Sequence, residues 1–222
     1  MKHLLRTQGH LLGLISLMFL IFFGQCLLGR EAYLQWMTVP DKIIEAWHHL
    51  LTGDFSAIDF RTFSSLLTYA FLHADIEHVT FNMIYFWIFG ALLVELLGWR
   101  WMLLIFGVTA VGGSLCHVLM NRTSTVPMLG ASGALMGFEG AYLALAVRWT
   151  LPDPHVWPIA SPIPPSRLAL LAVLGVTFDY LAIMQGQDTG TAYGAHIGGF
   201  TTGLVFAALA APRPTGRTVR RR

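Results

Sequence analysis

Long apolar runs separated by short polar segments dominate the pattern of this chain. A membrane-spanning helix needs roughly 20 mostly apolar residues. Six segments approach that length: 11–28, 76–97, 101–120, 131–148, 168–186 and 192–211. We therefore predict an all-α membrane protein, a six-transmembrane-helix bundle in which residues 1–222 form a single domain. A basic tail follows the last helix at residues 212–222.

The first apolar run could also be a signal peptide, because Lys2 and Arg6 precede it. The run from 11 to 28 is longer than the apolar part of a signal peptide, which spans about 7–15 residues. The sequence Phe23-Gly24-Gln25-Cys26 offers no small-residue cleavage site. We therefore expect this segment to remain as a transmembrane helix.

Basic residues distinguish the two sides of the predicted bundle. With six crossings, one set of loops and tails holds ten of the 14 Lys and Arg residues and the other holds four. The richer set is Lys2, Arg6, Arg100, Arg148, Arg167, Arg213, Arg217, Arg220, Arg221 and Arg222. Loops rich in Lys and Arg stay in the cytoplasm. We therefore expect both termini to be cytoplasmic.

Two connecting segments have patterns of their own. Within the long outer segment 29–75, residues 41–52 place apolar side chains on one helical face, which predicts a short amphipathic helix. Such a segment can lie in the outer headgroup region, although an ordinary external loop is the alternative. The inner segment 149–167 contains six prolines, which predict an irregular connector.

The composition agrees with a membrane protein and limits the partners. Apolar residues make up 55% of the chain and charged residues 12%, against about 25% charged in ordinary soluble domains. The net charge of +2 indicates no nucleic-acid partner. Cys26 and Cys116 are two cysteines without zinc-site spacing. We expect no metal, no cofactor and the lipid bilayer as surroundings.

A serine and a histidine stand at the outer ends of two predicted helices. Ser132 lies in Gly130-Ala-Ser-Gly133, and His196 begins the run His196-Ile-Gly-Gly199. A lone Gly-x-Ser-Gly is weak evidence, and small residues at i and i+4 also serve helix packing. The small residues form two stripes that we expect to face each other: Gly133, Gly137 and Ala141 against Gly199 and Gly203. Such packing would bring Ser132 and His196 together.

Four polar groups fall at one depth near the outer surface. Ser132 and His196 lie within the first turns of their helices, and His78 and Asn82 form an i, i+4 pair at the start of another. A histidine inside a membrane helix is costly, which favours a function. The alternative is that each group only ties helices together, but the shared level of all four favours a catalytic site.

The chain resembles the rhomboid intramembrane proteases in three motifs. They are His73-Ala-Asp-Ile-Glu-His78-Val-Thr-Phe-Asn82, Gly130-Ala-Ser132-Gly133 and Ala195-His196-Ile-Gly-Gly199-Phe-Thr-Thr-Gly203, in the family's order. The resemblance implies a serine endopeptidase that cleaves transmembrane proteins. It implies Ser132 as nucleophile and His196 as general base. It also implies an oxyanion hole formed by the side chains of His78 and Asn82 with the Ser132 backbone N–H.

The sequence departs from the family at two places. Ser64-Ser65 stands where members often have a Trp-Arg pair, and Met136 stands where some have a tyrosine one turn after the serine. No third catalytic member is expected for a dyad. We interpret Glu139 and Asp179, two carboxylates within the predicted spans, as polar ties between helices.

Other functions are less consistent with the pattern. An inactive relative that binds membrane proteins would be expected to lose the serine or the histidine. A channel would place polar groups through the full membrane depth. A zinc protease would need His-Glu-x-x-His, which is missing. The short tails suggest a bacterial cytoplasmic membrane, with the active site facing its outer side. The sequence identifies neither the substrate nor the oligomeric state.

Overall fold

A computed structural model describes residues 2–151, 164–186, 190–215 and 220–221, and they are almost entirely helical. In chain order the elements are α1 (Lys2–Leu28), α2 (Arg30–Tyr33), η1 (Leu34–Trp36), α3 (Pro40–Thr52), α4 (Ala57–Thr68), η2 (Tyr69–Phe71), α5 (Ile76–Leu97), α6 (Trp99–Met120), α7 (Ser132–Arg148), β1 (Trp149–Thr150), α8 (Pro165–Met184), α9 (Tyr193–Ala210) and β2 (Arg220–Arg221). The two short strands pair antiparallel. The expectation of an all-α fold is confirmed.

Five helices are long and apolar enough to cross a membrane, judged by length and composition over the described residues. They are Gln8–Leu28, Ile76–Leu97, Trp99–Met120, Ser166–Met184 and Tyr193–Ala210. The helix at the fourth predicted position, α7, has 17 residues and is not among them. Its crossing, and with it the six-helix count, stays a prediction. At 1.5 Å per residue its length is about 25 Å, short of a 30 Å bilayer core.

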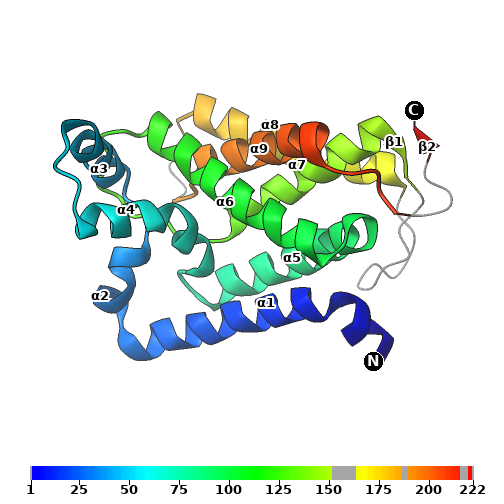
Figure 1. The fold of residues 1–222 in the computed structure, drawn as a ribbon, viewed down its shortest axis with the longest axis horizontal. Coiled ribbons are helices and arrows are strands. Elements are labelled where there is room, and N and C mark those ends of the chain that lie inside the picture. Colours follow the sequence, from blue (N-terminus) through cyan, green and yellow to red (C-terminus); the bar gives the residue numbers. More distant parts are fainter. Residues whose placement is uncertain (1, 152–163, 187–189, 216–219, 222) are drawn as a thin grey trace.

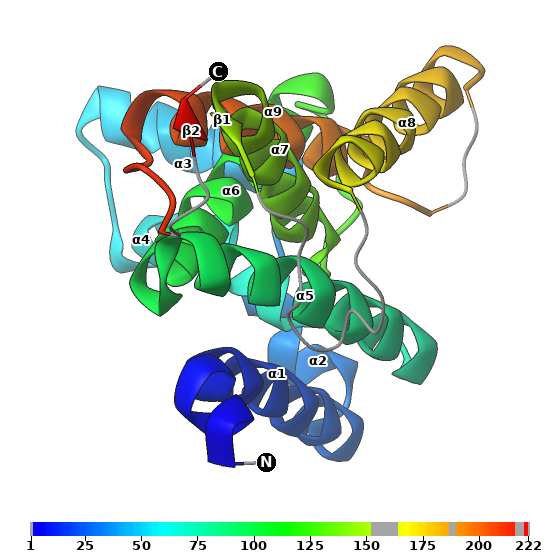
Figure 2. The ribbon, with the colours of Figure 1, turned by 90° about the vertical axis from the view of Figure 1, so that its right-hand side faces the viewer.

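The short helix α7 is the centre of the bundle. It packs against α6 and α9 and also contacts α5 and α8. Helix α1 lies outside, along α5, and α8 lies at the periphery (Figures 1 and 2). Most residues of α7 are buried, whereas many large apolar side chains of α8 are exposed. The central helix therefore meets protein on nearly every side.

Glycines allow α7 and α9 to approach backbone to backbone. A Cβ atom added at Gly199 would overlap the carbonyl oxygen of Gly133, and one added at Gly203 would overlap the carbonyl of Gly137. A Cβ on Gly137 would in turn overlap Thr109 of α6. With Gly133, these are the four glycines that the sequence places in two facing stripes. A Cβ has no space at Gly137, Gly199 or Gly203, and at Gly133 it would lie 3.1 Å from the carbonyl oxygen of Ala195.

The two ends of the bundle differ. The start of α1 and the β1–β2 pair lie at one end, whereas α3 and α4 lie at the other (Figure 1). Both ends of the described chain therefore lie at one end of the bundle (Figure 1). Which side is cytoplasmic stays a prediction.

The segment before α5 is largely helical. The amphipathic helix predicted over 41–52 coincides with α3, which has Pro40 at its start and ends at Gly53 with φ of 86°. Trp47 on this helix is exposed and Ile43 is buried. The predicted irregular connector 149–167 lies mostly outside the described residues, as does part of the basic tail 212–222.

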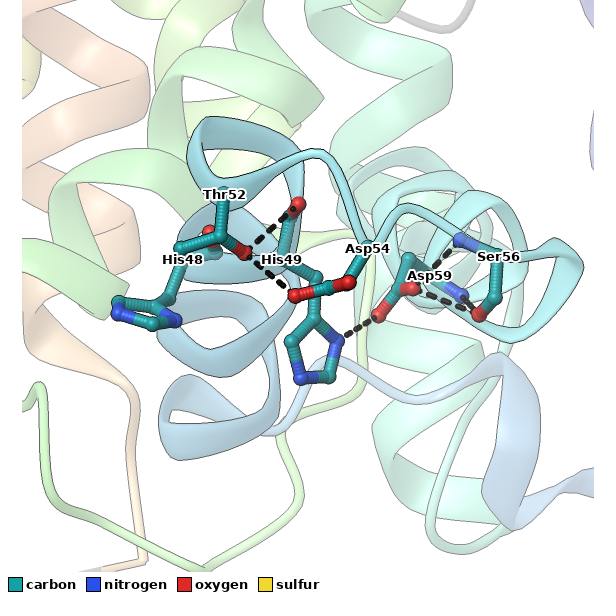
Figure 3. Close-up of polar contacts among 6 residues, drawn as sticks. All are labelled: His48, His49, Thr52, Asp54, Ser56 and Asp59. Atoms are coloured by element: carbon teal, nitrogen blue, oxygen red, sulfur yellow. Dashed lines mark hydrogen bonds and ion pairs between the residues drawn. The ribbon is translucent and has the colours of Figure 1, made fainter.

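One ionic contact joins α3 to α4. His49 Nδ1 of α3 lies 2.8 Å from Asp59 Oδ1 of α4 (Figure 3). The other oxygen of Asp59 accepts from the N–H and the hydroxyl of Ser56, which caps α4. Hydrogen bonds from Ser56 and His49 lower the pKa of Asp59 to about 2. The bond to Asp59 raises the pKa of His49 above 6.5.

This segment holds the loop that leads to Ser132. Thr38 and Met128 exchange two backbone hydrogen bonds, of 3.2 and 2.8 Å. The N–H of Gly130 donates to the carbonyl of Tyr69 at 3.0 Å. The Thr38 hydroxyl donates to the carbonyl of Ser65. Ser64 and Ser65 stand at the positions where family members often have a Trp-Arg pair. The N–H of Asp41 also donates to the carbonyl of Ser124, so the backbone of loop 121–131 is held at three points before it reaches α7.

Candidate active site

Ser132 and His196 are in hydrogen-bonding contact across the α7–α9 interface. Ser132 is the first residue of α7, and His196 lies in the first turn of α9. The Oγ atom of Ser132 is 2.8 Å from Nε2 of His196. A serine nucleophile and its base need about 2.6–3.2 Å. The contact has the geometry required for proton transfer from the hydroxyl.

The other ring nitrogen of His196 meets a carboxylate. Its Nδ1 lies 2.8 Å from Oδ2 of Asp179, which α8 contributes. When Asp179 is ionised it can only accept, and in that state Nδ1 carries the proton and Nε2 accepts from Ser132. The histidine side chain is 15% exposed and that of Asp179 is 17% exposed. Three residues from three helices thus form one hydrogen-bonded line.

An open cavity of about 990 Å³ lies over this line of residues. Ser132 and His196 line it together with His78 and Asn82 of α5 and Met136 of α7. Its other lining residues come from the N-terminal end of α5, the C-terminal end of α6, loop 121–131 and residues 190–192. The cavity therefore opens at the end of the bundle that is opposite the chain termini.

Gly130 brings the ring of His78 close to Ser132. Its φ of 119° disfavours any residue with a side chain. A Cβ at this position would lie 2.7 Å from Cε1 and 2.8 Å from Nε2 of His78. Glycine thus provides both the backbone conformation and the space for the ring.

The hydrogen bond that Nδ1 of His78 accepts makes Nε2 the donor nitrogen of the ring. The backbone N–H of Ala74 donates to Nδ1 of His78, at 3.4 Å. In the neutral ring the proton then resides on Nε2, the nitrogen beside Gly130. Asp75 caps the helix by accepting from the His78 N–H at 2.7 Å, which fixes the residue in the first turn of α5.

Asn82 provides a second donor. It is 6% exposed, and its Nδ2 has no hydrogen-bond partner among the described residues. A buried amide without a partner costs free energy. Because Asn82 lines the cavity, its Nδ2 can donate to a group that enters the cavity from outside.

The start of α7 adds electrostatic attraction for an anion. The first N–H groups of a helix have no intrahelical acceptor, and the helix dipole is positive there. Ser132 occupies this position. Its backbone N–H can therefore join His78 and Asn82 around one developing negative charge.

His73 is buried beside the cavity rather than in it. Its ring meets the ring of His78 edge to face, with centroids 5.2 Å apart. Gln25 of α1 holds its backbone through two hydrogen bonds, of 3.1 and 3.2 Å. Burial lowers the pKa of His73 to about 3, so the ring is neutral at physiological pH. These contacts suit a packing role.

Two residues near the site were not linked to it by the sequence. Asp179 is predicted as a tie between helices, and its contact does join α8 to α9, but the sequence did not indicate that its partner is the histidine beside Ser132. His117, near the C-terminal end of α6, also lines the cavity. Its signal was present in the sequence, since a histidine in an apolar run is a functional candidate. Glu139 lies elsewhere, buried on α7, with one oxygen 3.7 Å from the Cβ position of Gly175 in α8.

The described residues provide no set of metal ligands at this site. Among the described residues, no group of three or more His, Cys, Asp or Glu side chains could hold a metal ion. The groups in the cavity are instead those of acyl transfer, namely a hydroxyl with an adjacent base and donors for an oxyanion.

Comparisons with known proteins give one consistent result. A family model described as "Rhomboid domain" matches residues 61–213. RHOMBOID-like protein 6, mitochondrial, of Arabidopsis thaliana is 35% identical over 151 residues, which are 67% of this chain and 44% of that protein. RHOMBOID-like protein 1 of the same plant is 32% identical over 150 residues, 67% of this chain and 35% of that protein.

A third relative comes from a different organism. Rhomboid protein 1, mitochondrial, of Saccharomyces cerevisiae is 29% identical over 147 residues, 64% of this chain and 40% of that protein. The aligned regions thus cover between 35% and 44% of these three relatives. The matched range 61–213 contains α5, α6, α7, α8 and α9. It therefore contains every residue of the cavity described above.

Proposed function

Because the chain belongs to the rhomboid family, we propose that it is an intramembrane serine endopeptidase that cleaves transmembrane proteins. The chain is an integral, multi-pass membrane protein. The observation that carries the proposal is the 2.8 Å contact between Ser132 Oγ and His196 Nε2 beneath an open cavity. The contact pairs a nucleophile with a base, and the two residues come from two of the three motifs that resemble the family.

The first chemical step is acylation. Ser132 Oγ attacks the carbonyl carbon of the scissile peptide bond while His196 Nε2 takes the hydroxyl proton. The carbonyl oxygen becomes an oxyanion that accepts hydrogen bonds from His78, Asn82 and the backbone N–H of Ser132. One such donor contributes about 3–4 kcal/mol in soluble serine proteases. The C–N bond then breaks, and His196 returns the proton to the leaving amine.

Deacylation repeats the sequence with water. His196 takes a proton from a water molecule whose oxygen attacks the acyl carbon, and Ser132 leaves with the returned proton. The cavity opens at the ends of helices rather than at their middle, which gives water a short path to the site. Both residues lie within the first four positions of their helices, a depth of roughly 5 Å at 1.5 Å per residue.

The substrate must present an extended peptide to this cavity. A peptide bond inside a helix is shielded by its neighbours, so the substrate helix has to unwind locally. Gly and Pro weaken a helix by about 1 and 3 kcal/mol relative to Ala. We propose that substrates carry such residues near the outer end of their transmembrane segment.

The orientation and the sixth crossing belong to the same proposal. With α7 as a crossing, the basic residues gather at the end that holds the chain termini, and the cavity faces the outer side. Two of the relatives reported above are named as mitochondrial. The comparisons therefore do not support the expected bacterial cytoplasmic membrane, which stays a prediction.

A cleavage assay tests the proposal. The purified full chain would be reconstituted in liposomes with a single-span substrate that carries Gly and Pro near one end of its span. Mass spectrometry should find two products from wild type and none from Ser132→Ala. Equal cleavage by the two proteins, or none by wild type across a panel of such substrates, would contradict the proposal.

A further inference from the structure

We propose that Asp179 is the positioning residue of a Ser–His–Asp line, so that the active site operates as a triad rather than as a dyad. The inference rests on the proposed function. Its observation is the 2.8 Å contact between Asp179 Oδ2 and His196 Nδ1, on the ring edge opposite Ser132. No step of the acylation described above makes use of this carboxylate.

Asp179 lies on a helix whose surface is otherwise largely apolar. Helix α8 exposes much of its apolar surface, including Phe178 and Tyr180 on either side of the aspartate. A carboxylate in an apolar membrane helix is costly unless it is paired. Within the described part of the chain, the hydrogen-bond partner of Asp179 is His196. The free-energy cost of placing this carboxylate in an apolar helix is therefore offset by its hydrogen bond with His196.

Asp179 also selects the tautomer of the His196 ring. A neutral imidazole has one donor nitrogen and one acceptor nitrogen. The carboxylate holds the proton on Nδ1, which leaves the lone pair of Nε2 directed at the Ser132 hydroxyl. Without an acceptor at Nδ1, the proton can reside on Nε2 instead, and Nε2 then donates to the Ser132 hydroxyl. In that state the histidine cannot act as a base.

Asp179 further stabilises the positive charge that forms on His196 during the reaction. When His196 takes the serine proton it becomes an imidazolium, and no covalent bond to Asp179 forms. The carboxylate keeps its own charge and attracts the new cation across the existing hydrogen bond. The charge pair exists only after proton transfer, so it lowers the barrier to acylation more than it strengthens substrate binding.

The alternative is a purely structural tie between α8 and α9, and the chain offers a matched control. Glu139 is a buried carboxylate on α7, and its Oε2 lies 3.7 Å from the Cβ position of Gly175 in α8. Glu139→Gln removes a carboxylate near α8 without touching His196. A structural role for Asp179 would make Glu139→Gln and Asp179→Asn behave alike.

The experiment combines kinetics with ring NMR on the full chain in detergent micelles. Asp179→Asn, Asp179→Glu and Glu139→Gln would be compared with wild type for kcat, KM, thermal unfolding and the rate at which a fluorophosphonate labels Ser132. We expect Asp179→Asn to lose on the order of 10²–10⁴-fold in kcat, with KM within about threefold. Asp179→Glu should recover at least about tenfold over Asp179→Asn, and Glu139→Gln should stay near wild type.

The ¹⁵N spectrum of the His196 ring provides a readout that a structural tie would not move. Wild type should show a protonated Nδ1 and an unprotonated Nε2, and Asp179→Asn should show protonation of Nε2. The His196 signals are assigned by their loss in His196→Gln. This measurement on wild type stands even if a variant does not fold.

The outcomes separate the two proposals. Labelling and kcat in folded Asp179→Asn within twofold of wild type would overturn the positioning role and leave the protease proposal standing. An equal loss in Asp179→Asn and Glu139→Gln would overturn it too. If wild type neither cleaves nor labels, the proposed function fails, while an Nε2-protonated ring in wild type would overturn the role of Asp179 by itself.

Discussion

The backbone of Gly199 lies directly against the carbonyl of Gly133, with no space for a Cβ between them. This contact stands beside the catalytic pair, because Gly133 follows Ser132 and Gly199 lies one turn after His196. The 2.8 Å between Ser132 and His196 spans 64 positions of sequence. The approach of two helices, rather than any local turn, determines that distance.

We predict that Gly199→Val inactivates the enzyme although the residue does not line the cavity. Its side chain would push α7 and α9 apart, and about 1 Å of displacement at a nucleophile–base pair costs on the order of 10²-fold in rate. Gly199→Ala should also lose activity, but less, because its Cβ already overlaps the Gly133 carbonyl. The measurement is probe labelling of Ser132 together with thermal unfolding.

Gly107→Ala is the matched control for this series. Nothing lies within 4 Å of a Cβ at Gly107 on α6, so the substitution should leave activity unchanged. Full activity of a folded Gly199→Val protein would show that the close approach of the two helices is not needed for catalysis.

We predict that His78→Ala and Asn82→Ala each lower kcat by about 10²–10³-fold while KM changes little. The oxyanion that they bind exists only on the reaction path, so their loss affects turnover rather than substrate binding. Steady-state kinetics on a transmembrane substrate gives both parameters. Glu77→Ala, an exposed neighbour on α5, serves as control. An unchanged kcat in both variants would assign the pair to structure instead.

We predict that Gly130→Ala lowers activity at least tenfold and destabilises the fold by about 1–2 kcal/mol. The backbone there has φ of 119°, which L-residues adopt at a cost of that size. Its Cβ would also contact the ring of His78 at 2.7 Å. The control is Gly53→Ala, where φ is 86° and the space is open. That variant should lose stability but keep activity, and equal activity in the two would show that the His78 contact is unimportant.

We predict that the His49–Asp59 contact stabilises the fold mainly between pH 4 and 6.5. The pKa of Asp59 falls from 3.8 to about 2, so its contribution is present above about pH 4 and is lost toward pH 2. The pKa of His49 rises above 6.5, so its contribution is complete below pH 6.5 and disappears as pH rises through the folded-state value.

Thermal unfolding across pH checks this prediction. The Tm difference between wild type and His49→Ala should be largest in the window from pH 4 to 6.5 and smaller at pH 9. His48→Ala, at an exposed neighbouring position, should show no such window. A Tm difference that is constant with pH would mean that the contact contributes through packing and not through charge.

Hydrophobic length and spacing were enough to predict most of the helices. The apolar runs marked α5, α6, α8 and α9 within a few residues, because spanning helices need a nearly uninterrupted apolar surface. The same rule predicted α7, over 131–148 against the observed Ser132–Arg148, but it gave no indication that this helix lies at the centre of the bundle. Its apolar surface is covered by protein, so its length is not matched to the lipid.

The candidate site was predictable only where spacing within one helix carries the information. His78 and Asn82 share a face because they are one turn apart, and the glycine stripes indicate a close helix contact. The partner of Asp179 could not be found in this way. Its contact with His196 depends on the rotation of α8 about its axis, and that rotation is set by packing against α7 and α9, not by any local pattern.

The central claim is that Ser132 is a nucleophile activated by His196, and covalent labelling tests it most directly. The purified protein in detergent would be treated with a fluorophosphonate, digested and analysed by mass spectrometry. We predict one adduct, on the peptide that contains Ser132, that is absent in Ser132→Ala and at least about 10³-fold slower to form in His196→Ala. An unlabelled Ser132 in the folded wild type, or labelling at the same rate in His196→Ala, would contradict the account.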